Sequence, residues 1–131
     1  LDQPGPYQIQ AAIAGHHANA PSPAHTQWHS IAQLYDRLIE MAPTPVVELN
    51  RVVAHSMADG PAAGLTLLDR TKGLESYHLY HATRGDLLRR LARPTEAAAC
   101  YRRALGHAEN VSERQFLQRR LADLAVHGDA E

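Results

Sequence analysis

Histidine is the residue type with the most evident chemical potential in this sequence, because nine of the 131 residues are histidines. Two pairs have spacings that place both rings on one helix face: His25 with His29, and His78 with His81. A zinc site needs three or four ligands, commonly including cysteine or carboxylate, and neither pair has an obvious third ligand nearby. We therefore expect no metal and no cofactor, and interpret most of these imidazoles as surface or boundary residues.

The possible nucleophiles lack the neighbours that would activate them. Cys100 is the single cysteine, and it lies at a helical step that favours packing. The chain has no Gly-rich nucleophile elbow, no P-loop and no GxGxxG motif. We expect a protein that is not an enzyme and has no catalytic residues. With one cysteine, no secretory leader and no apolar run of membrane-spanning length, we expect a cytoplasmic location and no membrane contact.

Composition favours helices over strands. The sequence is 44% hydrophobic but only 5% aromatic, and it contains 22 Ala and 16 Leu against 4 Ile and 6 Val. Ala and Leu lose little conformational freedom in a helix, whereas β-branched residues are the ones that suit a pleated sheet. The length of the chain is typical of one domain. Residue 1 is Leu rather than Met, so we expect this chain to be part of a longer protein.

Gly and Pro residues fall between stretches with helical apolar spacing, and they divide the chain into about seven helices. Short links imply antiparallel hairpins. Asn110 followed by Glu113 resembles a capping box at the start of the last helix. The fifth helix is expected to bury Leu79, Ala82, Leu88 and Leu91. We predict a lead-in at residues 1–5, a helical domain at 6–126 and a flexible tail at 127–131. The expected helices are 6–18, 26–42, 45–58, 61–71, 76–92, 94–107 and a last one from Asn110 through Leu124.

Self-comparison reveals a repeat, because Tyr35, Leu68 and Tyr101 lie 33 residues apart. This spacing is close to the period of tetratricopeptide (TPR) repeats. Gly85 sits where two helices must approach closely, and Ala97 is the small residue expected to pack against it. The sequence therefore predicts an all-α, TPR-like right-handed helical repeat.

Charge is distributed unevenly along a chain whose net charge is only −1. Residues 1–66 carry five acidic and two basic side chains, whereas residues 67–131 carry nine acidic and eleven basic ones. A nucleic-acid surface is one interpretation of the arginines, but Asp86 with Arg90 is an i, i+4 pair typical of a solvated helix. Aromatic residues for base stacking are not interleaved with the arginines. We expect no direct DNA binding by this chain.

An ordered series of six segments resembles one family over nearly the whole chain, the C-terminal TPR-like domain of extracytoplasmic-function (ECF) RNA polymerase sigma factors. The segments are GPYQIQAAIAGHHA (5–18), WHSIAQLYDRL (28–38), PTPVVELNRVVA (43–54), GPAAGLTLLD (60–69), YHLYHATRGDLLRRL (77–91) and EAAACYRRAL (96–105).

The resemblance implies a non-catalytic regulatory or protein-interaction extension that modulates transcription initiation. The implied partners are the N-terminal regions of the same sigma factor, the RNA polymerase core or a regulatory protein. The polar positions shared with the family and the groove-facing positions of the best repeat have two interpretations. One is a partner-binding surface, and the other is a set of internal hydrogen bonds between hairpins. The candidate partner-binding residues are Asn50, Arg51, His78, Arg84, Asp86, Arg89 and Arg90.

Two other functions remain open. A helical small-ligand sensor would have an enclosed apolar pocket between hairpins, near His17, Trp28, Tyr35 and His78. A weaker possibility is a divergent hydrolase or a metal-dependent activity that uses the histidines, which would need three ligands at one point.

Overall fold

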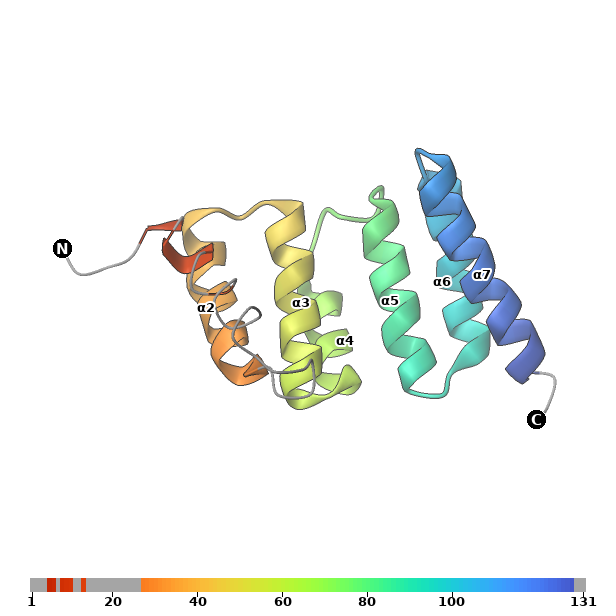
Figure 1. Cartoon of the computed structure of the whole chain (residues 1–131), viewed down its shortest axis with the longest axis horizontal. Helices are drawn as coiled ribbons and strands as arrows, with labels where there is room; N and C mark the ends of the chain where they lie inside the picture. Colours follow the sequence, from red (N-terminus) through yellow and green to blue (C-terminus); the bar gives the residue numbers. More distant parts are fainter. Residues whose placement is uncertain (1–4, 7, 11–12, 14–26, 129–131) are drawn as a thin grey trace. The chain divides into compact units, whose positions relative to one another are not determined.

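The computed structural model describes residues 5–6, 8–10, 13 and 27–128. All regular secondary structure in these residues is helical. Residues 6, 8–10 and 13 are helical, and six longer helices follow in short succession (Figure 1). These helices are α2 (Trp28–Met41), α3 (Pro45–Asp59), α4 (Pro61–Arg70), α5 (His78–Arg90), α6 (Pro94–His107) and α7 (Val111–Gly128). The predicted all-α class is confirmed.

Local signals determine where these helices begin. Pro45 and Pro94 occupy first positions of α3 and α6, where a missing N–H is harmless. The Thr44 hydroxyl accepts a hydrogen bond from the Val47 N–H at 3.2 Å, and the Asn110 carboxamide accepts one from the Glu113 N–H at 2.9 Å. The second contact confirms the expected cap. Helix α7 continues to Gly128, two residues beyond the predicted domain end at 126.

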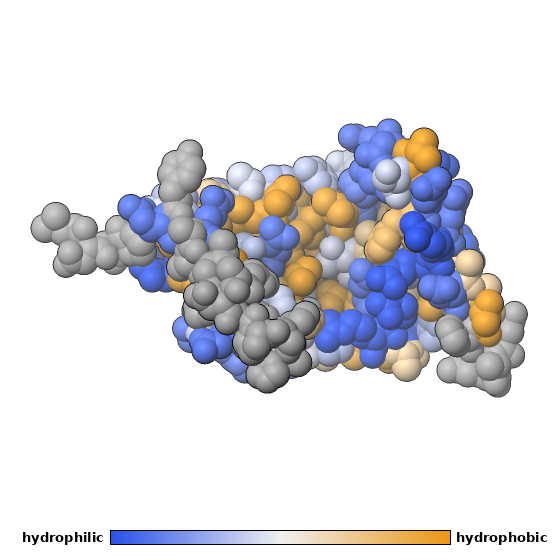
Figure 2. Space-filling model, viewed as in Figure 1, coloured by the Kyte–Doolittle hydropathy of each residue, from blue (hydrophilic) through white to orange (hydrophobic). Residues whose placement is uncertain are grey.

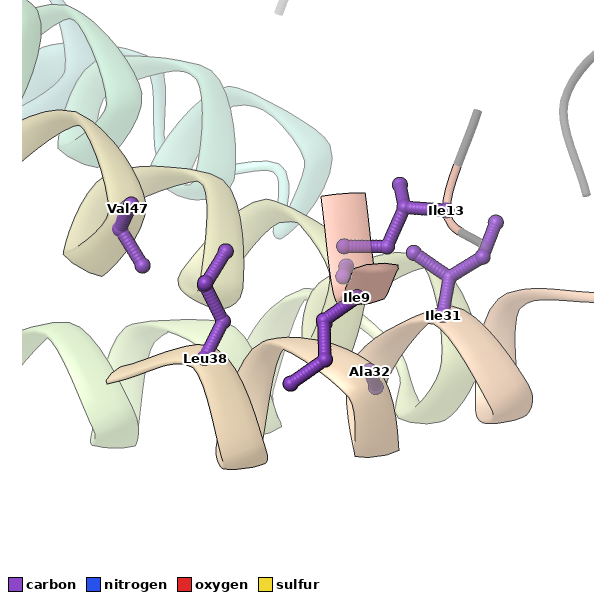
Figure 3. Close-up of a cluster of buried hydrophobic side chains, with 7 residues drawn as sticks. Ile9, Ile13, Ile31, Ala32, Leu38 and Val47 are labelled. Atoms are coloured by element: carbon purple, nitrogen blue, oxygen red, sulfur yellow. The ribbon is translucent and has the colours of Figure 1, made fainter. Parts of the chain in front are cut away.

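The chain divides into two compact units, unit 1 (residues 1–64) and unit 2 (residues 65–131), with the division inside α4. In unit 1, α2 packs on α3 as a hairpin. Its core is a cluster of buried aliphatic side chains from the first helical segment, α2 and α3, with Trp28 and Tyr35 packed against it (Figure 3). The cluster consists of Ile9, Ile13, Ile31, Ala32, Leu38, Val47 and Ala54.

Unit 2 is built around the hairpin of α5 and α6, with α7 packed on α6. Gly85 is buried against Tyr101, whose own exposure is 0%, and Ala97 is equally buried. The close approach predicted at Gly85 is confirmed, but the atoms nearest to a β-carbon at this position belong to the Tyr101 ring rather than to Ala97. The reason is that the large ring of Tyr101 extends back across the hairpin to the glycine.

The buried face of α5 includes Ala82 and Leu88, as predicted, but not Leu79. Leu79 was expected in the core but is 41% exposed, whereas His81 is 6% exposed. His81, Gly85 and Leu88 follow one another at helical spacing, and all three are buried. Leu79 lies roughly 160° around the helix from His81 and is therefore not part of the buried row formed by His81, Gly85 and Leu88.

Candidate functional site

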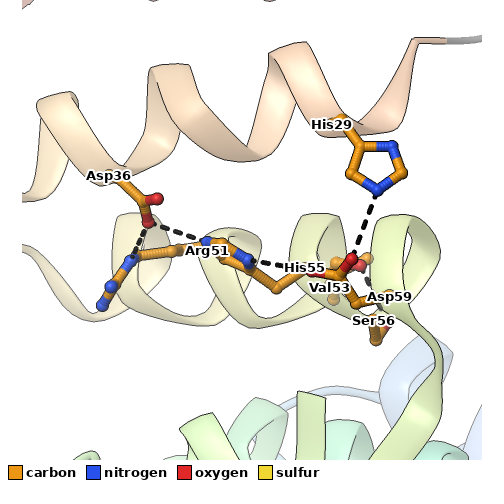
Figure 4. A network of polar contacts seen from close by, with 7 residues as sticks. All are labelled: His29, Asp36, Arg51, Val53, His55, Ser56 and Asp59. Carbon is orange, nitrogen blue, oxygen red and sulfur yellow. Dashed lines mark hydrogen bonds and ion pairs between the residues drawn. The ribbon is translucent and has the colours of Figure 1, made fainter. Parts of the chain in front are cut away.

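Asp36 on α2 is the centre of a polar network in unit 1 (Figure 4). Its Oδ1 accepts hydrogen bonds from Arg51 Nε at 2.6 Å and from His55 Nε2 at 2.8 Å, both on α3. Burial alone would raise the pKa of Asp36, but the hydrogen bonds from Arg51 and His55 outweigh it and hold the pKa below its ordinary value. Arg51, one of the predicted partner-binding residues, therefore joins α2 to α3.

A second carboxylate extends this network. Asp59, at the end of α3, accepts a hydrogen bond from His29 Nε2 at 3.2 Å, and its other oxygen lies 3.9 Å from His55 Nδ1. His55 thus stands between two aspartates, one on each helix of the hairpin (Figure 4). The sequence predictions did not include this contact, although the i, i+4 spacing of His55 and Asp59 is a signal from which it could have been predicted.

Asn50 lies one residue before Arg51 but on another face of α3. It is exposed, and it shares a hydrogen bond with the phenol of Tyr35. Burial raises the pKa of Tyr35, and the bond to Asn50 offsets part of that rise. Val46, Val53 and Met57 are at i−4, i+3 and i+7 from Asn50 and are 40–48% exposed, so these four residues form a partly apolar face, here called the α3 face.

Asp86 on α5 is the centre of a polar network in unit 2, as Asp36 is in unit 1. The Tyr101 hydroxyl donates to Asp86 Oδ1, while Arg120 Nε and Arg89 Nη2 lie 3.5 Å and 3.9 Å from the same oxygen. Burial, followed by the hydrogen bond to Asp86, raises the pKa of Tyr101 to about 12 against the opposing influence of Arg89. Sequence reasoning identified Asp86 and Arg89 but missed Arg120, which comes from α7.

The other predicted residues of unit 2 also have partners within the chain. His78 Nε2 lies 2.9 Å from Glu113 Oε1, which connects α5 to α7, and Arg84 forms an ion pair with Asp69 at the end of α4. Arg90 is exposed in the last turn of α5. The partner-binding role of the seven residues remains a prediction, but for most of them the structure supplies an intramolecular role as well.

His78 and His81 do not converge on a common point. His78 faces Glu113, whereas the Nε2–H of His81 donates to the carbonyl of Glu75 at 2.6 Å, and the His81 ring stacks on His107 with centroids 5.4 Å apart. His25 and His17 lie outside the described residues. Among residues that the structure does describe, no group of three or more His, Cys, Asp or Glu side chains is arranged to hold a metal ion.

Trp28 lines an open surface depression rather than an enclosed pocket. Its other lining residues are Gln27, His29, Ser30, Met57 and Ala58. Tyr35 packs against the core cluster of unit 1, and Cys100 is buried in unit 2, where burial raises the pKa of its thiol.

Comparison with solved structures places this arrangement of helices in a known architecture. The first TPR of Spaghetti (RPAP3), solved bound to the HSP90 peptide SRMEEVD, superposes with a TM-score of 0.71 at 18% identity over 100% of this chain and 98% of that one. The fold is TPR-like. Within the described part, no helix combines the length and the apolar character needed to cross a membrane.

Sequence comparison adds a bacterial relative. The protein named "Uncharacterized protein R00370" of Rhizobium meliloti (strain 1021) is 45% identical over 125 residues, which are 95% of this chain and 30% of that protein. The chain thus spans less than a third of the relative that it matches. No family model matches the sequence.

Proposed function

We propose that this chain is a non-catalytic protein-interaction domain that regulates transcription initiation as the C-terminal extension of an ECF sigma factor. The TPR-like fold carries the interaction part of the proposal, since stacked helical hairpins create extended surfaces for binding. The solved TPR domain that it resembles was captured with a peptide, which supports a protein partner for this chain too.

The α3 face supports a binding role within unit 1. Val46, Val53 and Met57 keep 48%, 40% and 44% of their surface exposed, with Asn50 among them. Figure 2 shows hydrophobic side chains gathered over α3. Exposed apolar side chains that are grouped in this way are typical of interaction sites.

The sigma-factor part of the proposal rests on the six segments between Gly5 and Leu105 that resemble the family. A bacterial relative that extends well beyond the matched 30% is consistent with promoter-binding and polymerase-binding regions elsewhere in such a protein. The partners would be those N-terminal regions, the RNA polymerase core or a regulatory protein, with no direct DNA contact by this domain and a cytoplasmic setting.

A small-ligand sensor is less well supported. The depression beside Trp28 is open, Tyr35 belongs to the packing around the core cluster, and His78 is paired with Glu113. Core packing explains the position of Tyr35, and the contact with Glu113 explains that of His78, so neither residue indicates an enclosed ligand pocket.

The test is transcription in vitro by the full-length protein with core RNA polymerase, compared with a version that lacks this domain. We expect the deletion to change promoter-directed transcript yield severalfold, and Val53→Glu to reproduce part of the change without altering the melting temperature. Gln118→Glu, on an exposed position of α7, is the matched control. Equal transcription with and without the domain, or promoter binding by the isolated domain, would refute the proposal.

A further inference from the structure

Met57 is an oxidisable side chain within the α3 face. It is 44% exposed, and the exposed Val53 and Val46 lie about one turn and about three turns before it on the helix. The chain has two methionines, and the other, Met41, is the last residue of α2 with a similar exposure of 38%. A small oxidant therefore reaches both thioethers, but only Met57 belongs to the face that supports binding.

The third sulfur atom of the chain is shielded. Cys100 is 4% exposed, and burial raises the pKa of its thiol, so the reactive thiolate is scarce. A thioether does not ionise, so the reaction of methionine with an oxidant depends on its exposure. Mild oxidation of this protein should therefore modify its methionines before its cysteine.

A depression with polar walls lies beside Met57. It forms where the start of α2 meets the end of α3, and Figure 4 shows His29 reaching across this junction. Met57 lines the depression together with Gln27, Trp28, His29 and Ser30. The Gln27 carboxamide and the Ser30 hydroxyl are hydrogen-bond donors, whereas a thioether sulfur is only a weak acceptor. Reduced Met57 therefore has little reason to prefer the depression to the apolar α3 face.

Oxidation reverses this preference. In the reaction with hydrogen peroxide, the Met57 sulfur attacks one peroxide oxygen, so that an S–O bond forms and the O–O bond breaks. The other oxygen takes the remaining proton and leaves as water, while sulfur loses two electrons and peroxide gains them. The product, methionine sulfoxide, is polar and chiral. Because methionine has three rotatable bonds, the sulfoxide can turn from Val53 toward the donors of Gln27 and Ser30.

We propose that Met57 is a modification site, at which hydrogen peroxide forms methionine sulfoxide and thereby weakens binding by the α3 face. A sulfoxide that stays on this face is covered by a partner without a hydrogen bond, which is unfavourable. A sulfoxide that turns into the depression leaves Val53 without its apolar neighbour. This inference rests on the proposed function as an interaction domain and names a regulation of that surface.

The modification should act on binding rather than on folding. Met57 is not a member of the buried cluster that forms the core of unit 1. Oxidation of a core methionine disrupts packing, whereas oxidation of an exposed one changes the surface. We therefore expect the circular dichroism spectrum and the melting temperature to be the same before and after oxidation.

The first test locates the modification in the 131-residue chain. Trypsin places Met41 and Met57 on separate peptides, residues 38–51 and 52–70, so mass spectrometry measures the oxygen added to each. Trp28 is the single tryptophan and lines the depression, so its fluorescence should shift when Met57 is oxidised. The shift should remain in Met41→Leu, the matched control, and should be absent from Met57→Leu.

The second test is transcription in vitro. The full-length protein is treated with hydrogen peroxide and then with catalase before core RNA polymerase is added, and each variant is compared with its own untreated sample. We expect treatment to change transcript yield severalfold, in the same direction as Val53→Glu. Met41→Leu should keep this response and Met57→Leu should lose most of it. Met57→Gln, which carries a polar group without oxidation, should change the yield in the same direction.

Three results would overturn the inference: equal peroxide responses in Met41→Leu and Met57→Leu, a Met57 that stays reduced while Met41 is oxidised, or an unchanged yield after oxidation of Met57. The third result is read beside the deletion of the domain. A deletion that changes the yield when oxidation does not refutes the regulation alone, whereas a deletion without effect refutes the proposed function and the regulation together.

Discussion

Gly85 on α5 lies directly against the ring of Tyr101 on α6. A β-carbon at residue 85 would be 2.8 Å from Cε1 and 2.9 Å from Cδ1 of the ring, closer than carbon atoms can pack. Because Tyr101 is 0% exposed, the ring has little room to withdraw. The missing side chain at residue 85 is therefore what allows α5 and α6 to pack at this distance.

Replacing this glycine should destabilise unit 2. Alanine is the better helix former by about 1 kcal/mol, but overpacking costs about 1–3 kcal/mol, so we expect Gly85→Ala to lower the free energy of unfolding by up to about 2 kcal/mol. Gly106 is the matched control, since a β-carbon there meets nothing within 4 Å. Gly106→Ala should be neutral or stabilising. Urea denaturation followed by circular dichroism measures both, and a Gly85→Ala variant as stable as the parent would contradict the prediction.

Ala92, in the turn between α5 and α6, has a backbone φ of 58°. This left-handed conformation costs a residue with a β-carbon about 1–2 kcal/mol and costs glycine almost nothing. Glycine also loses more freedom on folding, so we expect Ala92→Gly to raise the free energy of unfolding by about 0.5–1 kcal/mol. Ala99→Gly, at an exposed position of α6, should instead lower it by about 1 kcal/mol. Thermal melting of both variants checks the opposite signs.

The ionisation of Tyr101 should make the fold sensitive to alkali. Its pKa is raised from 10.0 to about 12, so its contribution to stability is present below pH 10 and is lost as pH rises through about 12. The pKa values of Tyr35 and Tyr80 are raised as well, so the late part of the phenolate absorbance in the parent should become smaller in Tyr101→Phe by the share of one of the five tyrosines. Stability should also fall more steeply between pH 10 and 12 in the parent than in the variant. Identical titration curves for the two proteins would rule this out.

Asp36 should contribute to acid sensitivity in unit 1. Because hydrogen bonds from Arg51 and His55 outweigh burial and lower its pKa below 3.8, its contribution is present above that value and is lost as pH falls through the lower folded pKa. At pH 7 we expect Asp36→Asn to cost less than about 1 kcal/mol, since 40% of the side chain is exposed and solvent screens the pair. The difference from the parent should shrink below about pH 4. Glu40→Gln, an exposed carboxylate change on the same helix, should show a smaller difference at pH 7.

The residues along the chain by themselves determined the approximate extent of the helices and the cap at Asn110. These features depend on neighbours within a few positions: Pro45 and Pro94 begin helices, and Asn110 caps α7. The backbone of a single helix sets such relationships, so they can be derived without knowing how helices pack.

Only the tertiary structure decided which side chains meet. Asp86 was expected to pair along its own helix, and Arg89 of that helix does lie 3.9 Å from it, but Tyr101 from α6 and Arg120 from α7 also contact it. Likewise, Tyr101 rather than Ala97 fills the space beside Gly85. Such contacts depend on the rotation and crossing angle of each helix against its neighbour, which small changes in packing alter and which no local spacing specifies.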